Sequence, residues 1–223
     1  MQKAGLTKGE AMNLLIGDSH VHYAFNEIDK ISTKDIKENL RLVETFDWTS
    51  LSYWINGISI FSVSRNLDAD MSLSNIDLYK YTNMFLIFGT NDALIYRENR
   101  QSWEECIPYY LESIEKIRIK YGIKKAYVIC PFYIKNLDNI DCWDSLRYKM
   151  NSYDDMNHII KDIKENIILE SRQYENINCI DMSNLFQIGE ELFATEYSLD
   201  GVHFNNQGQK IFFNKIYEGA SND

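Results

Sequence analysis

The sequence predicts a three-layer α/β protein, in which helices cover both faces of a parallel sheet of about five strands. Short apolar runs recur along the chain, each ended by or close to a glycine, a proline or an aspartate. Segments with helical periodicity separate them. Short, continuously apolar runs are typical of strands covered on both faces, and their alternation with helices indicates a parallel sheet.

Five runs fit such strands, and turn-forming residues mark the end of each. They are residues 12–16 before Gly17, 51–55 before Gly57, 84–88 before Gly89, 126–130 before Pro131, and 177–180 before Asp181. Glycine and proline at these points predict that the chain leaves the sheet and enters a loop.

Three longer segments have a helical pattern. Ser102 followed by Glu105 is a capping box that opens a helix ending at Gly122, and Pro108 should kink that helix. A second helix is expected to begin at Ser152, and a third near Asn205.

Length and composition favour one folded unit. The chain has 223 residues, of which 45% are apolar, which is enough to build a single sizeable core. We expect residues 1–11 to be a leader or arm and residues 12–223 to form one domain. No secretory signal or membrane span is evident, so we expect a cytoplasmic protein.

Charge and cysteine content exclude some partners and ligands. The formal net charge of −10 argues against nucleic acid or an anionic membrane as partner, since both would repel this surface. The four cysteines show no CxxC spacing, so buried reduced thiols are expected rather than disulfides or zinc ligands.

Three short motifs carry the chemistry: Gly17-Asp18-Ser19, Gly89-Thr90-Asn91-Asp92 and Asp200-Gly201-Val202-His203. In an open parallel sheet, ligands bind beyond the carboxyl ends of the strands. The loops that carry Ser19, Gly57 and Asn91 should therefore converge on one rim. A serine there needs a base, for which His203 is suited, and Asp200 can orient that imidazole. The backbone amides of Ser19 and Gly57 and the Asn91 side chain can serve as oxyanion donors.

The motifs, in this order, resemble those of the SGNH hydrolase superfamily, also called GDSL esterases and lipases. The resemblance spans residues 12 to about 217. It implies the SGNH hydrolase fold, with Ser19 as nucleophile and Asp200 and His203 completing the triad. It also implies an oxyanion hole formed by Ser19, Gly57 and Asn91. The glycine block, assigned to Gly57, is a single residue and the least specific of the four.

One departure from the family pattern opens an alternative. Ser19 is followed by His20-Val21-His22 where the family often has Leu or Ile. The resulting DxHxH form is that of metal-dependent amidohydrolases, in which both histidines bind zinc. Only His158 and His203 remain as further histidines, and an amidohydrolase barrel typically needs about 250 residues. A metal site is thus the weaker reading, and we expect none, nor any cofactor.

The segment 132–151 is long and aromatic, and it follows the fourth expected strand on the same rim. Loops of this length often act as lids or binding loops. We therefore expect Phe132 and Trp143 to line a substrate pocket, the alternative being a solvent-facing insertion with a short helix. His20 and His22 are expected to line the pocket or to pack rather than to take part in the chemistry.

We thus expect a flavodoxin-like α/β domain that hydrolyses an acyl ester of a small molecule or glycan through a serine triad. The alternatives are an O-acyltransferase acting on a sugar or natural-product hydroxyl and, more distantly, a catalytically silent binding module. The oligomeric state does not follow from the sequence.

Overall fold

The computed structural model describes residues 13–18, 20, 42–47, 60, 64, 67, 77–94, 103–134, 153–190 and 192–221. Five strands form one sheet, and all of its neighbouring strands are parallel: β1 (Asn13–Gly17), β2 (Leu42–Asp47), β3 (Asn83–Ile87), β4 (Lys125–Ile129) and β5 (Ile177–Ile180). The helices are α4 (Thr90–Leu94), α5 (Trp103–Tyr121), α6 (Tyr153–Ser171) and α7 (Asn206–Ser221). The predicted α/β class with a parallel sheet of about five strands is confirmed.

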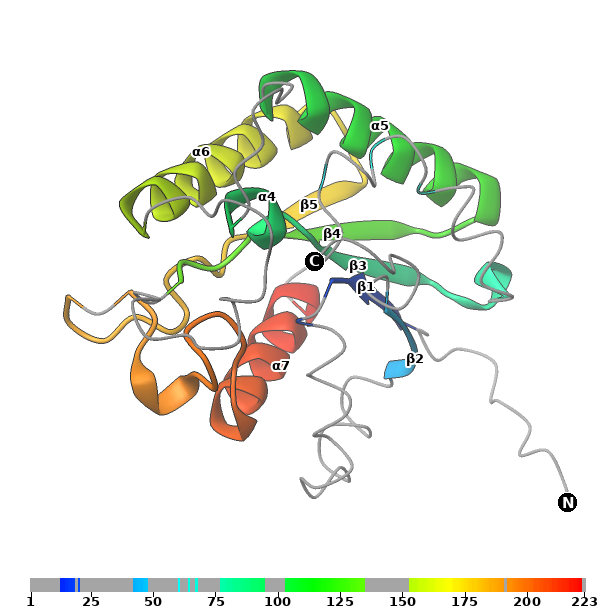
Figure 1. Ribbon diagram of the computed structural model, residues 1–223. Coiled ribbons are helices and arrows are strands. Elements are labelled where there is room, and N and C mark those ends of the chain that lie inside the picture. Colours follow the sequence, from blue (N-terminus) through cyan, green and yellow to red (C-terminus); the bar gives the residue numbers. More distant parts are fainter. Residues whose placement is uncertain are drawn as a thin grey trace, which may run out of the picture.

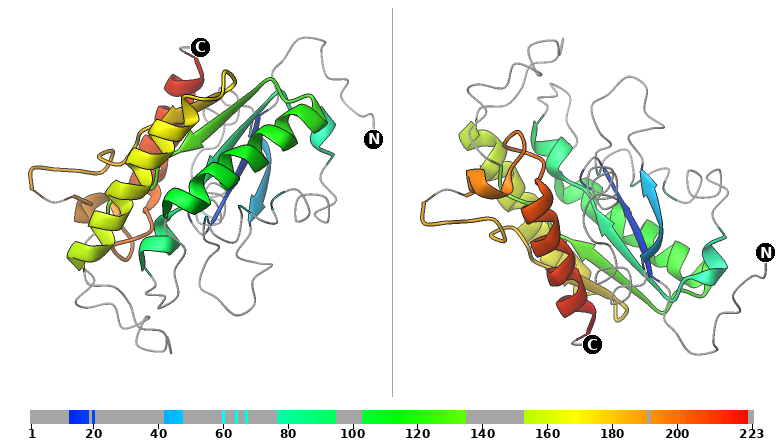
Figure 2. Two further views of the ribbon diagram at one scale, coloured as in Figure 1. Left: turned by 90° about the horizontal axis from the view of Figure 1, so that it is seen from above. Right: turned by 90° about the horizontal axis from the view of Figure 1, so that it is seen from below.

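Two helical layers enclose the sheet. Helices α5 and α6 lie side by side on one face, and α7 crosses the other (Figures 1 and 2). Successive strand residues alternate between two cores: Leu14 and Leu86 join the cluster shared with α5 and α6, whereas Leu15 and Phe85 join the cluster shared with α7. Since side chains of a strand point to opposite faces in turn, a strand buried on both faces must be apolar throughout.

Four of the five expected strands are confirmed to within one residue, namely β1, β3, β4 and β5. The strand expected at residues 51–55 lies outside the described residues. The sheet also contains β2, six residues in 42–47 that were not predicted from the sequence. Among the described strands, β2 lies at the end of the strand order and pairs with β1.

The three expected helices are present as α5, α6 and α7. Helix α5 continues through Pro108 to Tyr121, so the expected kink does not end it. Its core-facing residues on both sides of the proline, among them Ile107, Leu111 and Ile114, are completely buried. This packing compensates for the single backbone hydrogen bond that a proline removes.

The strand order β2-β1-β3-β4-β5 fixes where a ligand can bind. The chain leaves β1 towards β2 on one side and leaves β3 towards β4 on the other. The carboxyl ends of β1 and β3 therefore form the topological switch point, which is where ligands bind in such a sheet. The segments that follow these two strands are Asp18 to His20 and Gly89 to Asp92.

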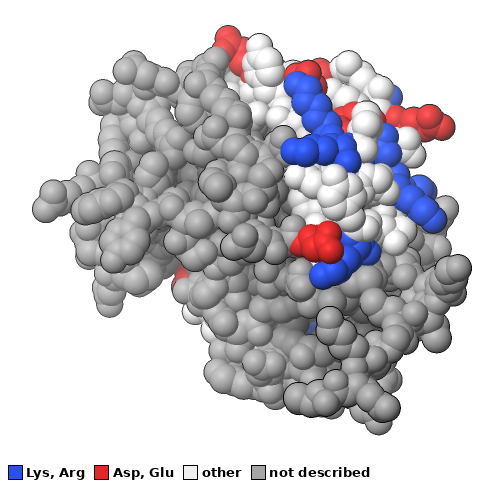
Figure 3. All heavy atoms as spheres, turned by 90° about the vertical axis from the view of Figure 1, so that its right-hand side faces the viewer, with Lys and Arg blue, Asp and Glu red and all other residues white. Residues whose placement is uncertain are grey.

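Basic and acidic side chains lie next to one another on the side of the molecule shown in Figure 3. Helix α5 carries the ion pairs Lys116–Glu112 (2.7 Å) and Arg118–Glu115 (2.6 Å). The Lys116–Glu112 pair is exposed, and such pairs contribute only roughly 0–1 kcal/mol each. The Arg118–Glu115 pair is part-buried and is held by two hydrogen bonds. Among the described helices, none combines the length and apolar character needed to cross a bilayer.

Candidate active site

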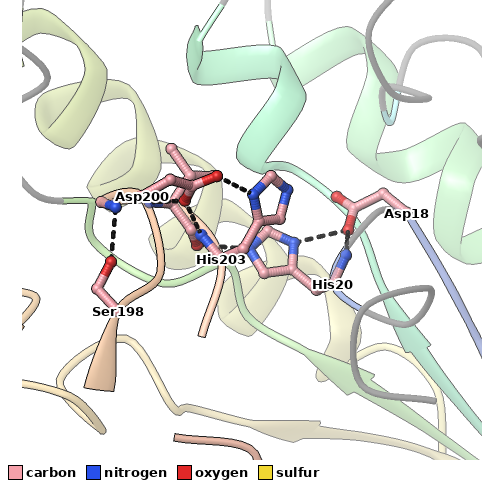
Figure 4. Close-up of polar contacts among 7 residues, drawn as sticks. Asp18, His20, Ser198, Asp200 and His203 are labelled. Carbon is pink, nitrogen blue, oxygen red and sulfur yellow. Dashed lines mark hydrogen bonds and ion pairs between the residues drawn. The ribbon is translucent and has the colours of Figure 1, made fainter. Parts of the chain in front are cut away.

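The predicted acid and base lie in a turn between the 3-10 helix η4 (Thr195–Tyr197) and α7. An antiparallel bridge between Ser198 and Phe204 joins its two ends. Within it, the Leu199 amide donates to the carbonyl of His203 (2.8 Å), and the Gly201 amide donates to the Ser198 hydroxyl (2.6 Å; Figure 4). Backbone hydrogen bonds therefore fix the shape of this turn.

Asp200 and His203 form a close pair. Asp200 Oδ2 lies 2.7 Å from His203 Nδ1, while Oδ1 accepts hydrogen bonds from the amides of Val202 (3.0 Å) and His203 (2.8 Å; Figure 4). Burial alone would raise the pKa of Asp200, but the hydrogen bonds and the charge of His203 outweigh it and lower the pKa to about 2. The carboxylate is thus ionised at neutral pH, and it retains the hydrogen on Nδ1 so that Nε2 is the basic nitrogen.

Val202, between Asp200 and His203, anchors the turn to the rest of the fold. Its side chain is buried in a small cluster with Ala93 of α4, Ile134 after β4, and Met156 and Ile160 of α6. The acid–base turn is therefore fixed to three other parts of the fold, in addition to its own backbone hydrogen bonds.

The end of β3 positions Asn91. Gly89 has φ +122°, and a Cβ there would lie 3.1 Å from Pro131 Cγ and 3.3 Å from Ile163 Cγ2. Only glycine fits this backbone conformation without strain. The chain then enters α4, where Asn91 is 5% exposed and its Nδ2 donates to Asp18 Oδ2 (3.2 Å).

Asp18 connects two of the motifs. Its Oδ1 accepts hydrogen bonds from the His20 amide (3.0 Å) and faces the His20 ring nitrogen Nδ1 (2.7 Å), while Oδ2 accepts from Asn91. A hydrogen bond from Asp18 to the backbone around Ser19 is expected from the sequence, and the contact with the His20 amide confirms it. The contacts of Asp18 with the His20 ring and with Asn91 were not predicted. An aspartate two residues before a histidine is the one signal that could have indicated the first of these contacts.

The structure brings the described motif residues together, because His20 Nε2 also lies 3.1 Å from the Val202 carbonyl (Figure 4). Asn91, Asp18 and His20 thereby connect through hydrogen bonds to the turn that carries Asp200 and His203. The other predicted site residues, Ser19, Gly57, His22 and Trp143, lie outside the described residues.

Phe132, expected to line a pocket or to belong to a solvent-facing insertion, and His20, expected to line a pocket or to pack, are both 1% exposed. The Phe132 ring contacts the rings of Phe186, Phe204 and Phe212 at centroid distances of 5.2, 6.0 and 5.8 Å. It also contacts His20. In the structure, both residues pack beneath the site, because the aromatic side chain that follows β4 enters the core shared with α7.

The surroundings of the histidines do not resemble a shared metal site. His158 lies on α6, where its side chain is 72% exposed and 3.6 Å from Asp162, whereas His20 is buried. Both ring nitrogens of His20 already lie within hydrogen-bonding distance of protein oxygens. Among the residues that the structure describes, no group of three or more His, Cys, Asp or Glu side chains is arranged to hold a metal ion.

Comparison with known proteins identifies the family of this chain. The model of the GDSL-like lipase/acylhydrolase family matches residues 15–216. Similar solved structures include a GDSL-like lipase from Bacteroides thetaiotaomicron (14% identity, 99% of this chain and 92% of that chain, TM-score 0.66). Others are a carbohydrate esterase family 3 protein from Talaromyces cellulolyticus (14%, 96% and 97%, 0.60) and a catalytic mutant of an acetylxylan esterase from Geobacillus stearothermophilus (14%, 93% and 93%, 0.57).

At these identities the solved structures show a shared fold, with the chains covering one another almost completely. No curated protein matches the chain. The resemblance inferred from the three motifs is therefore confirmed at the level of family and fold.

Proposed function

The chain belongs to the GDSL-like lipase/acylhydrolase family, and from this premise we propose that it is a serine-dependent acyl-ester hydrolase. The observation that carries the proposal is the Asp200–His203 pair, in which Oδ2 and Nδ1 lie 2.7 Å apart. The turn that carries this pair is connected by hydrogen bonds to His20 and, through it, to Asp18, and these two residues flank Ser19 in the sequence. An oriented imidazole beside a serine is the arrangement that activates a hydroxyl as a nucleophile.

In the proposed reaction, Ser19 Oγ attacks the ester carbonyl carbon while His203 Nε2 accepts the hydroxyl proton. The ionised Asp200 stabilises the imidazolium that results. Collapse of the tetrahedral intermediate breaks the bond between the carbonyl carbon and the alcohol oxygen, and His203 returns the proton to the departing alcohol. Water then attacks the acyl-serine with the same base, which releases the acid and regenerates Ser19.

The negative charge on the carbonyl oxygen needs donors in both steps. We assign this role to the backbone amides of Ser19 and Gly57 and to the side-chain amide of Asn91. The hydrogen bond from Asn91 to Asp18 supports the assignment, since it orients the Asn91 amide from the segment that precedes the nucleophile. Donors that are fixed before the reaction stabilise the developing charge without reorganisation.

Acetylated carbohydrates are the first substrates to test. An acetylxylan esterase and a carbohydrate esterase are among the similar folds. A sugar acetate also suits an acidic protein, since neither its acyl nor its alcohol part is charged.

The proposal is tested with p-nitrophenyl acetate and an acetylated oligosaccharide, with and without a chelator. We expect metal-independent release of acetate by the wild-type protein and none by Ser19→Ala. Activity that is lost with the chelator and restored by zinc would instead favour the metal alternative built on His20 and His22.

The same acyl-serine could pass its acyl group to a hydroxyl other than water. A panel of sugar acceptors, analysed by mass spectrometry, separates the two outcomes. Free acid as the only product, whatever the acceptor, supports a hydrolase, whereas acylated acceptor in excess of free acid supports the acyltransferase alternative.

Asn91→Ala is expected to lower kcat by about 10²–10³-fold, the usual effect of losing one oxyanion donor, with a smaller change in KM. Initial rates on one ester measure the effect. Asn166→Ala is the matched control, because Asn166 lies on α6 and donates to the carbonyl of Asp162 within its own helix. Equal rates for the two variants would remove Asn91 from the oxyanion hole.

A further inference from the structure

His20 has an oxygen partner on each ring nitrogen. Nδ1 lies 2.7 Å from Asp18 Oδ1, and Nε2 lies 3.1 Å from the Val202 carbonyl oxygen (Figure 4). The side chains of His20 and Asp18 are 1% and 0% exposed. A buried polar group is expected to satisfy its hydrogen bonds within the protein, and here both ring nitrogens do so.

These partners determine the protonation of the ring. A carbonyl oxygen can only accept, so Nε2 must carry a hydrogen. A second hydrogen must lie between Nδ1 and the Asp18 carboxylate, since two acceptors 2.7 Å apart would repel each other. Burial lowers the pKa of His20, but the charge of Asp18 and the hydrogen bonds to Asp18 and Val202 raise it more, with a further contribution from Asp200. The net shift is upward, which agrees with an imidazolium paired with a carboxylate.

The His20 ring connects the segment next to Ser19 with the turn that carries Asp200 and His203. Its sequence neighbour is Ser19, and through Asp18 it is connected to Asn91. On the other side, its partner Val202 is the residue between acid and base. The His20 ring also lies 5.5 Å from the His203 ring and 5.7 Å from the Phe204 ring, measured between centroids. The titratable groups facing His20 among the described residues are thus Asp18, Asp200 and His203.

Resting on the proposed function, we propose that His20 is a positioning residue: a buried imidazolium whose two N–H groups fix the nucleophile segment against the turn that carries Asp200 and His203. Val202 is the point of contact because its side chain is already anchored by Ala93 and Ile160. One hydrogen bond, from Nε2 to the Val202 carbonyl, then sets the distance between residues 182 positions apart in the chain.

Three substitutions separate the two N–H groups. His20→Gln can place a donor near the position of Nε2 and so preserve the contact with Val202. His20→Asn places its donor near Nδ1, preserving only the contact with Asp18, and His20→Phe preserves ring packing alone. We expect kcat to fall by about 10²-fold in the Asn and Phe variants, the effect of a misplaced reacting group, with KM within about twofold. The Gln variant should retain a kcat about tenfold higher than the Asn variant.

A measurement independent of activity completes the test. Nitrogen-15 spectra of the wild-type protein at neutral pH should show both His20 nitrogens protonated. The His203 Nδ1–H resonance should be kept in the Gln variant and broadened or shifted in the Asn variant. His158→Gln, at an exposed position on α6, controls for the loss of a histidine and should match the wild type in every measurement.

The proposal fails if His20 is neutral at neutral pH, if the Gln and Asn variants have equal kcat, or if the Phe variant keeps wild-type kcat. Failure of the proposed function has a different signature, namely no ester hydrolysis by the wild type or full hydrolysis by Ser19→Ala. In that case the two spectroscopic results still decide whether His20 positions the acid–base turn.

Discussion

Replacing His203 with alanine is expected to reduce kcat on an ester substrate by a factor on the order of 10⁶, as loss of the base does in other serine hydrolases. Without His203, the base that we assign to the hydroxyl proton of Ser19 is lost, and the ionised Asp200 loses the ring it orients. Ser19→Ala should cause a loss of similar size, because the nucleophile and its base act in the same step.

The double variant distinguishes a working triad from an incidental arrangement. If the residues act as a unit, Ser19→Ala added to His203→Ala should cost little more than either change alone. Circular dichroism of all three variants checks that each is folded. An inactive Ser19→Ala beside a fully active His203→Ala would show that His203 is not the base and that the Asp200–His203 turn serves only to lead into α7.

Most of the strands that could be predicted from the sequence are central and buried on both faces. β1, β3 and β4 are apolar runs that lie between two helical layers, and this pattern marks their positions closely. β5, with the sequence INCI, lies at one end of the strand order and is only partly buried, but its isoleucines and the Asp181 that follows still mark it. β2, with the sequence LVETFD, lies at the other edge of the sheet formed by the described strands, where it pairs with β1. An edge strand tolerates polar residues, so its sequence lacks the apolar run by which the others were found.

The contacts of the candidate site also differ in how well the sequence predicts them, because some are local and others join distant residues. The Asp200–His203 contact spans only three residues within a turn, so a motif of the form DxxH is enough to predict it. The contacts of Asp18 with Asn91 and of His20 with Val202 join positions far apart in the chain. No local pattern specifies such pairs. They depend on the strand order, which places the ends of β1 and β3 side by side.

The environment of Phe132 could not be predicted from the sequence. An aromatic residue directly after a strand, at the start of a long segment, is equally compatible with a pocket wall and with a core position. The structure places it among Phe186, Phe204 and Phe212, beneath His20. Burial of this kind depends on α7 and the preceding turn packing against the sheet, which the sequence near residue 132 does not encode.

Asp200→Asn is expected to lower kcat by about 10⁴-fold while the turn stays folded. Asparagine keeps an oxygen that can accept from the amides of Val202 and His203, as Asp200 Oδ1 does. At the position of Oδ2, however, it presents an NH₂ group to His203 Nδ1. That donor selects the tautomer with hydrogen on Nε2, and an Nε2 that carries hydrogen cannot accept the proton of Ser19.

The stability of wild type relative to Asp200→Asn should depend on pH, and the sign follows from the pKa of Asp200, which is lowered to about 2 in the folded wild-type protein. A carboxyl group whose pKa is lower in the folded than in the unfolded state stabilises the fold above its unfolded pKa, about 3.9. This contribution is lost as the pH falls towards 2. The difference in unfolding free energy between wild type and Asp200→Asn should therefore shrink as the pH falls from about 5 towards 2. Denaturant unfolding at several pH values measures it, and Asp162→Asn, at a half-exposed position on α6, is the control. A difference that grows below pH 4, or an Asp200→Asn variant with wild-type kcat, would show that the Asp200 carboxylate does not orient His203.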